Sequence, residues 1–284
     1  MAAIRLGDYR VFDLLLIEIG EKTFKGIINE DMKDTLLHYT AYYDKEGNLT
    51  RLLLEKGLDP NQRNINGVTP LMYAVSRGNV ESARLLILDK RTNVNEKDND
   101  KQTVLHYMLI SKQYSLVEFF LNKRKDKINF DIEDKKGRNI FFCACDTYSP
   151  NLDILAKLLK RGCNINSKNG QKTVLMFSVE KSNKILFDYL LKNKADVDEI
   201  DEVGETAVHK AVRNSDKYYL ERLISKFPDL TIRGDEHMYT PLMLSIDLNN
   251  SVYTSMLEKP RYDKDIINRY GKTAGEMLML KKMN

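Results

Sequence analysis

Apolar residues recur along the chain in a unit that holds two short helical patterns. In TPLMYAV (69–75) a Thr is followed by a large apolar residue two places on, and then by small or apolar residues at helical spacing. After a polar break, VESARLLILDK (80–90) forms a second amphipathic pattern. The starting Thr can accept a hydrogen bond from a free backbone N–H group, as helix N-cap residues do. The unit therefore predicts a helix, a turn and a second helix.

This unit returns at spacings of 34, 34, 36, 34, 33, 34 and 33 residues. Its first helix is expected to start at Thr35, Thr69, Thr103, Asn139, Thr173, Thr206, Thr240 and Thr273. The second helix is expected at 48–57, 80–90, 115–123, 152–162, 184–193 and 218–226. A segment with Asn, Asp and a turn closes each unit, as in DPNQRNING and DVDEIDEVG. One unit cannot bury its apolar face alone, so we expect the units to stack on one another.

These recurring sequence segments resemble the ankyrin repeat, whose pattern is D-x-x-G-x-T-P-L-H-x-A, then G-x-x-x-x-V-x-x-L-L, then G-A-D-V-N. NINGVTPLMYAVSRGNVESARLLI and DEVGETAVHKAV carry the likeness most clearly. The resemblance covers about residues 31–284. It implies a mainly α fold, an ankyrin-repeat solenoid of stacked helix-turn-helix plus β-hairpin units.

The same resemblance suggests an organisation in three parts. Residues 1–30, with YRVFDLLLIEI, are expected to form N-terminal capping helices. Residues 31–267 would hold six full repeats and a degenerate seventh, starting near 31, 64, 98, 135, 169, 201 and 235. Residues 268–284 are expected to form a C-terminal capping half-repeat. Capping units with a more polar outer face keep such arrays in solution.

Composition narrows the possible functions. The 45 Lys and Arg residues against 41 Asp and Glu residues give a net charge of +4, a mixed surface without a marked basic excess. No apolar run is long enough to span a membrane, and the N-terminus lacks the pattern of a secretion signal. Three cysteines do not make a disulfide framework, so we expect reduced thiols and an intracellular protein, cytoplasmic and/or nuclear.

Candidate chemistry is sparse. His38, His106 and His209 occupy the TPLH slot, where the resemblance implies a hydrogen bond to the neighbouring hairpin. Cys143 and Cys145 lie two residues apart on one expected helix and point apart, so we interpret them as small core residues, not metal ligands. Cys163 is interpreted in the same way. We predict no cofactor, no metal and no catalytic residues.

Motifs for phosphate-binding loops, serine hydrolases, zinc proteases and kinases are absent, and the repeats occupy nearly the whole chain. We therefore do not expect an enzyme or a small-molecule substrate. Basic residues do cluster in LNKRKDK (Lys123, Arg124, Lys125, Lys127) and DKKGR, whereas DEIDEVGE is acidic. These charges could form a solvated face or a strip that orients a partner.

In ankyrin arrays the usual contact surface is the concave side, made by the hairpin tips and the first-helix faces. Mapped onto this chain, it comprises Ile65, Asn66, Val68, Arg77, Asn99, Asp100, Gln102, Lys135, Lys136, Arg138, Lys172, Lys181, Glu202, Val203, Glu205, His237 and Tyr239. Ile65, Val68, Val203 and Tyr239 are expected to be exposed apolar or aromatic contacts within a charged rim.

The sequence thus predicts a protein-binding module, an adaptor or an inhibitor that masks its partner, which would be another protein. The alternative is a nucleic-acid-associated or regulatory subunit that uses the basic tips of repeats three to five. The near-neutral total charge makes nucleic acid the less favoured partner.

Overall fold

The computed structural model describes residues 27–29, 31–124, 128–258 and 265–283. The expected N-terminal capping helices, in residues 1–30, lie outside the described residues apart from strand β1 (Ile27–Asn29), which pairs antiparallel with β2 (Asp34–Thr35). The chain divides into two compact units. Unit 1 holds residues up to 144 together with 153–163, and unit 2 holds 145–152 together with 164–284.

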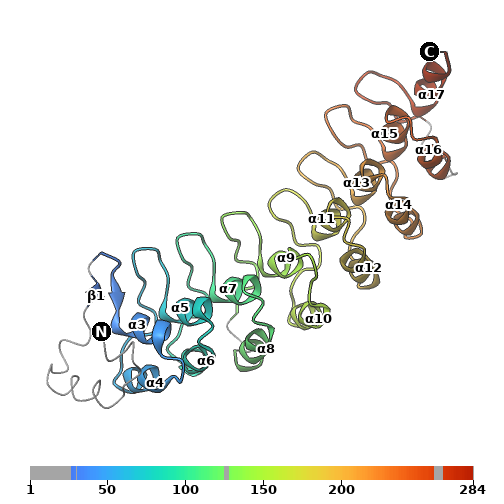
Figure 1. Cartoon of the computed structure of the whole chain (residues 1–284). Coiled ribbons are helices and arrows are strands. Elements are labelled where there is room, and N and C mark those ends of the chain that lie inside the picture. The colour runs from blue at the N-terminus through green and yellow to red at the C-terminus, as the bar shows by residue number, and fades with distance from the viewer. Residues whose placement is uncertain (1–26, 30, 125–127, 259–264, 284) are drawn as a thin grey trace. The chain divides into compact units, whose positions relative to one another are not determined.

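Helices come in pairs in both units, as the periodic pattern predicts (Figure 1). In unit 1 the helices are α3 (Leu36–Tyr43), α4 (Asn48–Glu55), α5 (Pro70–Arg77), α6 (Val80–Leu88), α7 (Val104–Ile110) and α8 (Tyr114–Lys123). The next pair, α9 (Ile140–Cys145) and α10 (Leu152–Lys160), lies mostly in unit 1. In unit 2 they are α11 (Val174–Glu180), α12 (Lys184–Lys192), α13 (Ala207–Asn214), α14 (Lys217–Ile224), α15 (Pro241–Asp247), α16 (Ser251–Leu257) and α17 (Ala274–Met283).

Each first helix begins at the predicted Thr or Asn. The Oγ1 atom of Thr69 accepts from the Met72 N–H at 3.4 Å, and the Asn139 side chain accepts from Phe142 N–H at 3.0 Å. The seventh pair has a second helix, α16, although its sequence matches the repeat poorly. A helix also forms in the expected C-terminal half-repeat, where α17 packs on α15.

The core of each unit lies between stacked helices. The first helices pack on one another, α3 on α5 and α5 on α7 in unit 1, and α11 on α13 and α13 on α15 in unit 2. Leu71, in α5, is only 2% exposed. Cys143, Cys145 and Cys163 are buried and form no disulfide, in agreement with their interpretation as core residues. Burial raises the pKa of Cys163 to about 12, so this thiol is protonated at neutral pH.

The histidines of the TPLH slot link three of the repeats to the repeat that follows. The Nε2 atom of His38 lies 3.0 Å from the carbonyl oxygen of Val68, and that of His209 lies 3.0 Å from the carbonyl of Tyr239. His106 makes the equivalent contact to Arg138 at 3.2 Å. This confirms the hydrogen bond to the neighbouring tip that the resemblance implied.

The tips themselves are turns with little β structure. Isolated bridges occur at Lys168–Thr173, Gly234–Tyr239 and Ile267–Thr273, and the described residues contain one two-stranded sheet. None of the described helices is long and apolar enough to cross a membrane.

Candidate functional site: tip residues and first-helix faces

An Asp or Asn side chain shapes each tip. In unit 1 the Asp98 carboxylate accepts from the N–H groups of Asp100 and Gln102 at 2.9 and 2.8 Å. In unit 2 the Asp201 carboxylate accepts in the same way from Val203 and Glu205, at 3.0 and 2.8 Å. Asx side chains that satisfy the N–H groups of a turn fix its backbone. The tips are therefore held in one conformation by residues that recur with the repeat.

Within each unit, hydrogen bonds join neighbouring tips. In unit 1 the Asn99 N–H donates to the Asn66 carbonyl at 2.9 Å, and the Lys135 N–H donates to the Asp100 carbonyl at 2.9 Å. In unit 2 the Glu202 N–H donates to the Gln171 carbonyl at 3.1 Å. Each unit thus presents a row of tips whose backbones are joined.

Two positions at the end of the tips are exposed in most repeats. They follow directly after the shaping Asp or Asn. Ile65 and Val203, at these positions, are 52% and 51% exposed. The exposed residues that the sequence predicted at these positions are Ile65, Asn66, Asn99, Asp100, Lys135, Lys136, Glu202 and Val203.

The position directly before the helix N-cap is buried for three of the predicted contacts, which corrects part of the predicted surface. Val68, Glu205 and Tyr239 were expected to be contacts, but they are 8%, 3% and 7% exposed. The burial of Val68 and Tyr239 follows from the links between repeats, whereas Glu205 is buried for a different reason. The carbonyls of Val68 and Tyr239 accept from His38 and His209, so both residues are held beneath the tip.

Ion pairs account for the burial of Glu205. Its carboxylate pairs with Lys210 at 2.5 Å and with Arg213 at 2.7 Å. Burial alone would raise the pKa of Glu205, but the hydrogen bonds from these two cations outweigh burial and hold the pKa below its usual value. Arg213 also pairs with Asp235 at 3.0 Å. Glu205 is therefore an internal anchor of the tip and not a surface contact.

The same position is partly buried in the other predicted residues, Gln102, Arg138 and Lys172. The Arg138 guanidinium donates to the Asp134 carboxylate at 2.7 Å, and its side chain is only 13% exposed. Lys172 pairs with Glu180 at 2.6 Å. Both cations are engaged within the protein. Lys135 and Lys136, in the tip at 134–138, are exposed, and Lys135 pairs with Asp100 at 2.8 Å.

The basic run at 123–127 is also less exposed than its sequence suggests. Arg124 is 8% exposed, and its guanidinium donates to the carbonyls of Asp89 and Thr92 at 2.6 and 3.2 Å. Lys125 and Lys127 lie outside the described residues. The run is therefore not a strip of free cations along its described part.

The remaining predicted residues lie next to aromatic rings. The Arg77 guanidinium lies 3.8 Å from the centroid of the Tyr42 ring. The Lys181 ammonium lies 5.7 Å from the Phe177 ring. His237 is partly exposed, and the Tyr270 hydroxyl lies 3.0 Å from its Nδ1 atom.

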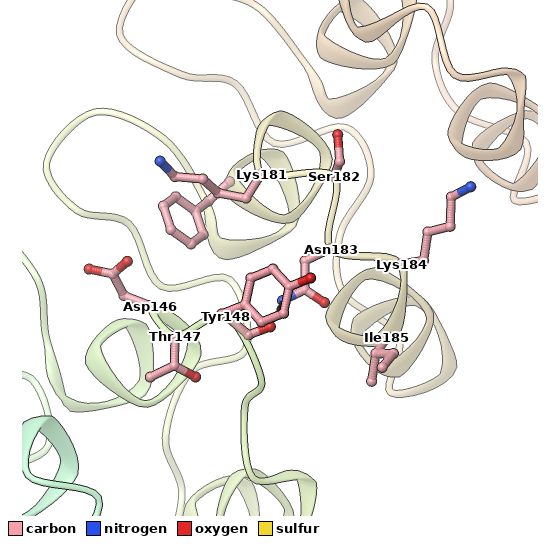
Figure 2. A pocket seen from close by; sticks show the side chains of 9 residues that line it. Asp146, Thr147, Tyr148, Lys181, Ser182, Asn183, Lys184 and Ile185 are labelled. Carbon is pink, nitrogen blue, oxygen red and sulfur yellow. Dashed lines mark hydrogen bonds between the residues drawn. The ribbon is translucent and has the colours of Figure 1, made fainter.

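Sequence reasoning missed a pocket in unit 2, shown in Figure 2, with a volume of about 450 Å³. It lies between the loop that follows α9 and the turn between α11 and α12. Tyr148 stands at its centre and is 99% exposed, and Ile185 is 62% exposed. Asn183 holds the loop by donating to the Tyr148 carbonyl at 3.3 Å. The sequence signal was the length of the loop, since 146–151 separates α9 from α10 where only 78–79 separates α5 from α6.

The charges around this pocket are unevenly available. Lys181 and Asp146 lie on one side of Tyr148 (Figure 2), whereas the Lys184 side chain extends away. The Lys184 ammonium pairs with Asp216 at 2.8 Å and lies 4.7 Å from the Tyr218 ring. The pocket is thus a mainly apolar depression with Lys181 at its edge.

No group of three or more His, Cys, Asp or Glu side chains that could hold a metal ion occurs among the residues that the structure describes.

Comparisons with known proteins agree with this architecture. The family model for ankyrin repeats matches three times, over residues 1–98, 88–169 and 175–268. The chain is similar to ankyrin repeat protein OPG189 of variola virus, with 25% identity over 70% of this chain and 41% of the relative. It is also similar to a putative ankyrin repeat protein, L371, of Acanthamoeba polyphaga mimivirus, with 24% identity over 98% of this chain and 39% of the relative. The chain thus spans about two fifths of the length of these relatives.

Among solved structures, the ankyrin repeat domain of Bcl-3 has a similar fold, with a TM-score of 0.68 and 20% identity. The similarity covers 79% of this chain and 97% of that domain. The repeated Thr starts, the paired helices, the His-to-tip links and the family model over most of the chain lead to one conclusion. This chain belongs to the ankyrin repeat family.

Proposed function

We propose that this chain is a non-enzymatic protein-binding module whose contact surface is made by the tip residues and the first-helix faces. Ankyrin repeats are in general protein–protein interaction modules, and their fold is typically non-catalytic. The observation that carries the proposal is the row of hydrogen-bonded tips in each unit, which exposes side chains of different chemistry on a repeated backbone.

The exposed pair changes from tip to tip. It is Ile65 and Asn66, then Asn99 and Asp100, then Lys135 and Lys136 in unit 1, and Glu202 and Val203 in unit 2. An apolar residue with a charged rim is a common composition for a protein interface. Because the backbone beneath is shared, the partner would be selected by these side chains. An adaptor and an inhibitor that masks its partner would both use such a surface.

We place the module inside the cell, in the cytoplasm or nucleus, because three buried thiols without a disulfide suit a reducing compartment. The basic alternative, a nucleic-acid partner, has less support. Arg124 and Arg138 donate to groups of the protein itself, and Lys135 pairs with Asp100 at 2.8 Å.

The experiment compares charge reversal on a tip with charge reversal on an outer surface. The test variant is Lys135→Glu with Lys136→Glu, which spares the structural pair of Arg138 and Asp134. The matched control is Lys56→Glu with Lys90→Glu, two exposed lysines of the same unit that follow second helices. Proteins captured from cell lysate with the unaltered chain would be identified by mass spectrometry and then titrated against each variant.

We expect the tip variant to bind an acidic partner at least about tenfold more weakly, equivalent to about 1.4 kcal/mol, and the control to bind like the unaltered chain. The loss should shrink at high salt because exposed charges are screened. Equal affinities of the tip variant and the control would contradict the proposed surface.

A further inference from the structure

A second, smaller pocket lies in unit 1 on the faces of α3 and α5. Its volume is about 170 Å³, which suits a single side chain better than a drug-sized ligand. Four of its six lining residues are tyrosines; the lining comprises Asp34, His38, Tyr39, Tyr42, Tyr43 and Tyr73. All four tyrosines are partly exposed. None of these residues was singled out from the sequence as a contact.

The rings form a connected aromatic wall. Tyr42 and Tyr43 have centroids 4.5 Å apart, and Tyr39 stacks on Tyr43 at 6.4 Å with an angle of 13° between the planes. Tyr73 meets Tyr42 edge to face at 5.7 Å. Tyrosine rings carry negative charge density on their faces, so such a wall attracts cations.

The wall holds a buried carboxylate. Asp34 is 7% exposed, and its oxygens accept from Asn64 at 3.0 Å and from the Tyr73 hydroxyl at 3.5 Å. Both donors are neutral groups. A cation placed beside a buried carboxylate stabilises its charged form.

The neighbouring imidazole does not supply that charge. The Thr35 N–H donates to His38 Nδ1 at 3.1 Å, so His38 Nε2 carries the proton and donates to the Val68 carbonyl. Burial lowers the pKa of His38, which keeps the ring neutral near pH 7. Among the six lining residues, the carboxylate of Asp34 is therefore the group that carries the charge.

The protein already shows what these rings accept. The Arg77 guanidinium lies over the Tyr42 ring at 3.8 Å, within the usual range of a cation–π contact. A planar guanidinium can lie flat on a ring while the N–H groups along its edge donate to a carboxylate as a fork, a geometry that a compact ammonium group lacks.

From the aromatic wall, the buried carboxylate and the bound guanidinium beside it, we infer that this pocket receives an arginine side chain of a protein partner. The inference rests on the proposed function, because the pocket belongs to the first-helix face of unit 1. The proposed function describes the contact surface by its tips. The arginine pocket adds one residue type that the partner would place on this surface.

The test titrates N-acetyl-arginine amide into the full chain and follows backbone amide resonances by NMR. N-acetyl-citrulline amide has nearly the same shape without the charge, and N-acetyl-lysine amide carries the charge without the planar group. We expect shifts confined to residues around α3 and α5, with the arginine probe binding at least tenfold more tightly than either of the others. Equal binding of citrulline would overturn the cation site, and equal binding of lysine would overturn its assignment to arginine.

Variants locate the site. Asp34→Asn keeps the size of the side chain, and Tyr39→Leu removes one ring without touching the Asp34 hydrogen bonds. Both should weaken binding of the arginine probe at least fivefold, whereas Tyr148→Leu, an exposed tyrosine of unit 2, should not change it. If Asp34→Asn does not fold, binding of the arginine probe by Tyr39→Leu alone tests the site. Unchanged binding by a folded Tyr39→Leu would overturn the inference.

This titration uses no partner protein, so its failure is separate from failure of the proposed function. If the probe does not bind while Lys135→Glu with Lys136→Glu weakens the captured partner, the arginine pocket is wrong and the tip surface stands. If the probe binds but the tip variant has no effect, the pocket stands and the tip surface is wrong.

Discussion

Three histidines show how single residues hold the repeats together. His38, His106 and His209 accept a hydrogen bond at Nδ1 from the N-cap residue of their own helix, at 3.1 Å in each case. Their Nε2–H groups then point to a carbonyl of the next tip. Each ring is buried and uncharged in this role, and protonating Nδ1 would remove the acceptor that fixes its orientation.

Stability should consequently fall on mild acidification. Burial lowers the pKa of His38, His106 and His209, so the folded chain binds fewer protons than the unfolded chain. The stability that these rings contribute is present above the unfolded pKa of about 6.5 and is lost as pH falls below it. Urea unfolding at pH 7.5, 6.5 and 5.5 should show a declining free energy of unfolding. His209→Gln should reduce the slope, and a flat profile for the unaltered chain would contradict the neutral rings.

Core packing gives a second prediction for a single residue. Leu71 is 2% exposed in α5, between α3 and α7, so Leu71→Ala should cost about 2–5 kcal/mol through lost burial and the cavity that remains. Ile65→Ala, at a tip position that is 52% exposed, should change stability by less than about 0.5 kcal/mol. Urea unfolding measures both, and similar losses would mean that the repeat register is wrong.

At the scale of elements, side chains of one repeat cap the first helix of the repeat before it. The Asn79 amide donates to the carbonyls of Ala41 and Tyr42, at 2.9 and 2.8 Å, where α3 ends. In unit 2, Lys281 of α17 donates to the carbonyls of Ile246 and Asp247 at 2.7 Å, where α15 ends. The last carbonyls of a helix have no partner within it, and a cation there also offsets the helix dipole. Helix ends are thus completed by the next repeat.

Removing one such cap tests this arrangement. Asn79 is 5% exposed, so Asn79→Ala leaves two carbonyls without their donor in a buried place, and we expect a loss of about 1–3 kcal/mol. Asn99→Ala, which removes an exposed amide bonded to the Ile65 carbonyl, is the matched control and should cost less than about 0.5 kcal/mol. Thermal unfolding midpoints that fall equally in both variants would argue against the cap.

Much of this arrangement could be predicted from the sequence because it repeats. Thr69 and Thr173 start helices for a local reason, the need of a free N–H group for an acceptor, and this need leaves a signal in every repeat. Burial at the position before the cap has no such signal. Val68 is covered because His38, 30 residues earlier, reaches its carbonyl, and that contact depends on the stacking of two repeats.

The pockets were missed for a related reason. The tyrosines of LLHYTAYY read as ordinary helix residues, and only the stacking of α3 on α5 brings Tyr42 and Tyr73 together. Tyr148 sits in a loop whose unusual length was visible, but its full exposure was not. The roles of residues 1–30 and 268–284 as terminal caps stay predictions.

For the whole molecule, positive and negative charges nearly balance, and several described arginines are engaged within the protein. The net charge is +4, and arginines such as Arg91, Arg124 and Arg161 donate to backbone carbonyls of neighbouring repeats. Binding to bulk nucleic acid depends on many free Lys and Arg side chains and weakens steeply with salt. The distribution of charge therefore favours a protein partner whose side chains complement the charge and polarity of each tip.

We therefore expect no measurable binding to a mixed-sequence 20-base-pair DNA duplex at 150 mM salt and chain concentrations up to about 100 µM, a range in which non-specific DNA-binding proteins do bind. Fluorescence anisotropy of a labelled duplex measures this. Saturable binding that weakens steeply between 50 and 200 mM salt would revive the basic tips as a nucleic-acid surface.

The most direct test of the binding surface is amide hydrogen exchange of the chain with and without its captured partner, read by mass spectrometry. We predict slower exchange in the tips at 63–68, 98–102, 134–138 and 201–205 and in the first helices, with α6, α8, α12 and α14 unchanged. Protection confined to these second helices, with the tips exchanging as in the chain alone, would contradict it.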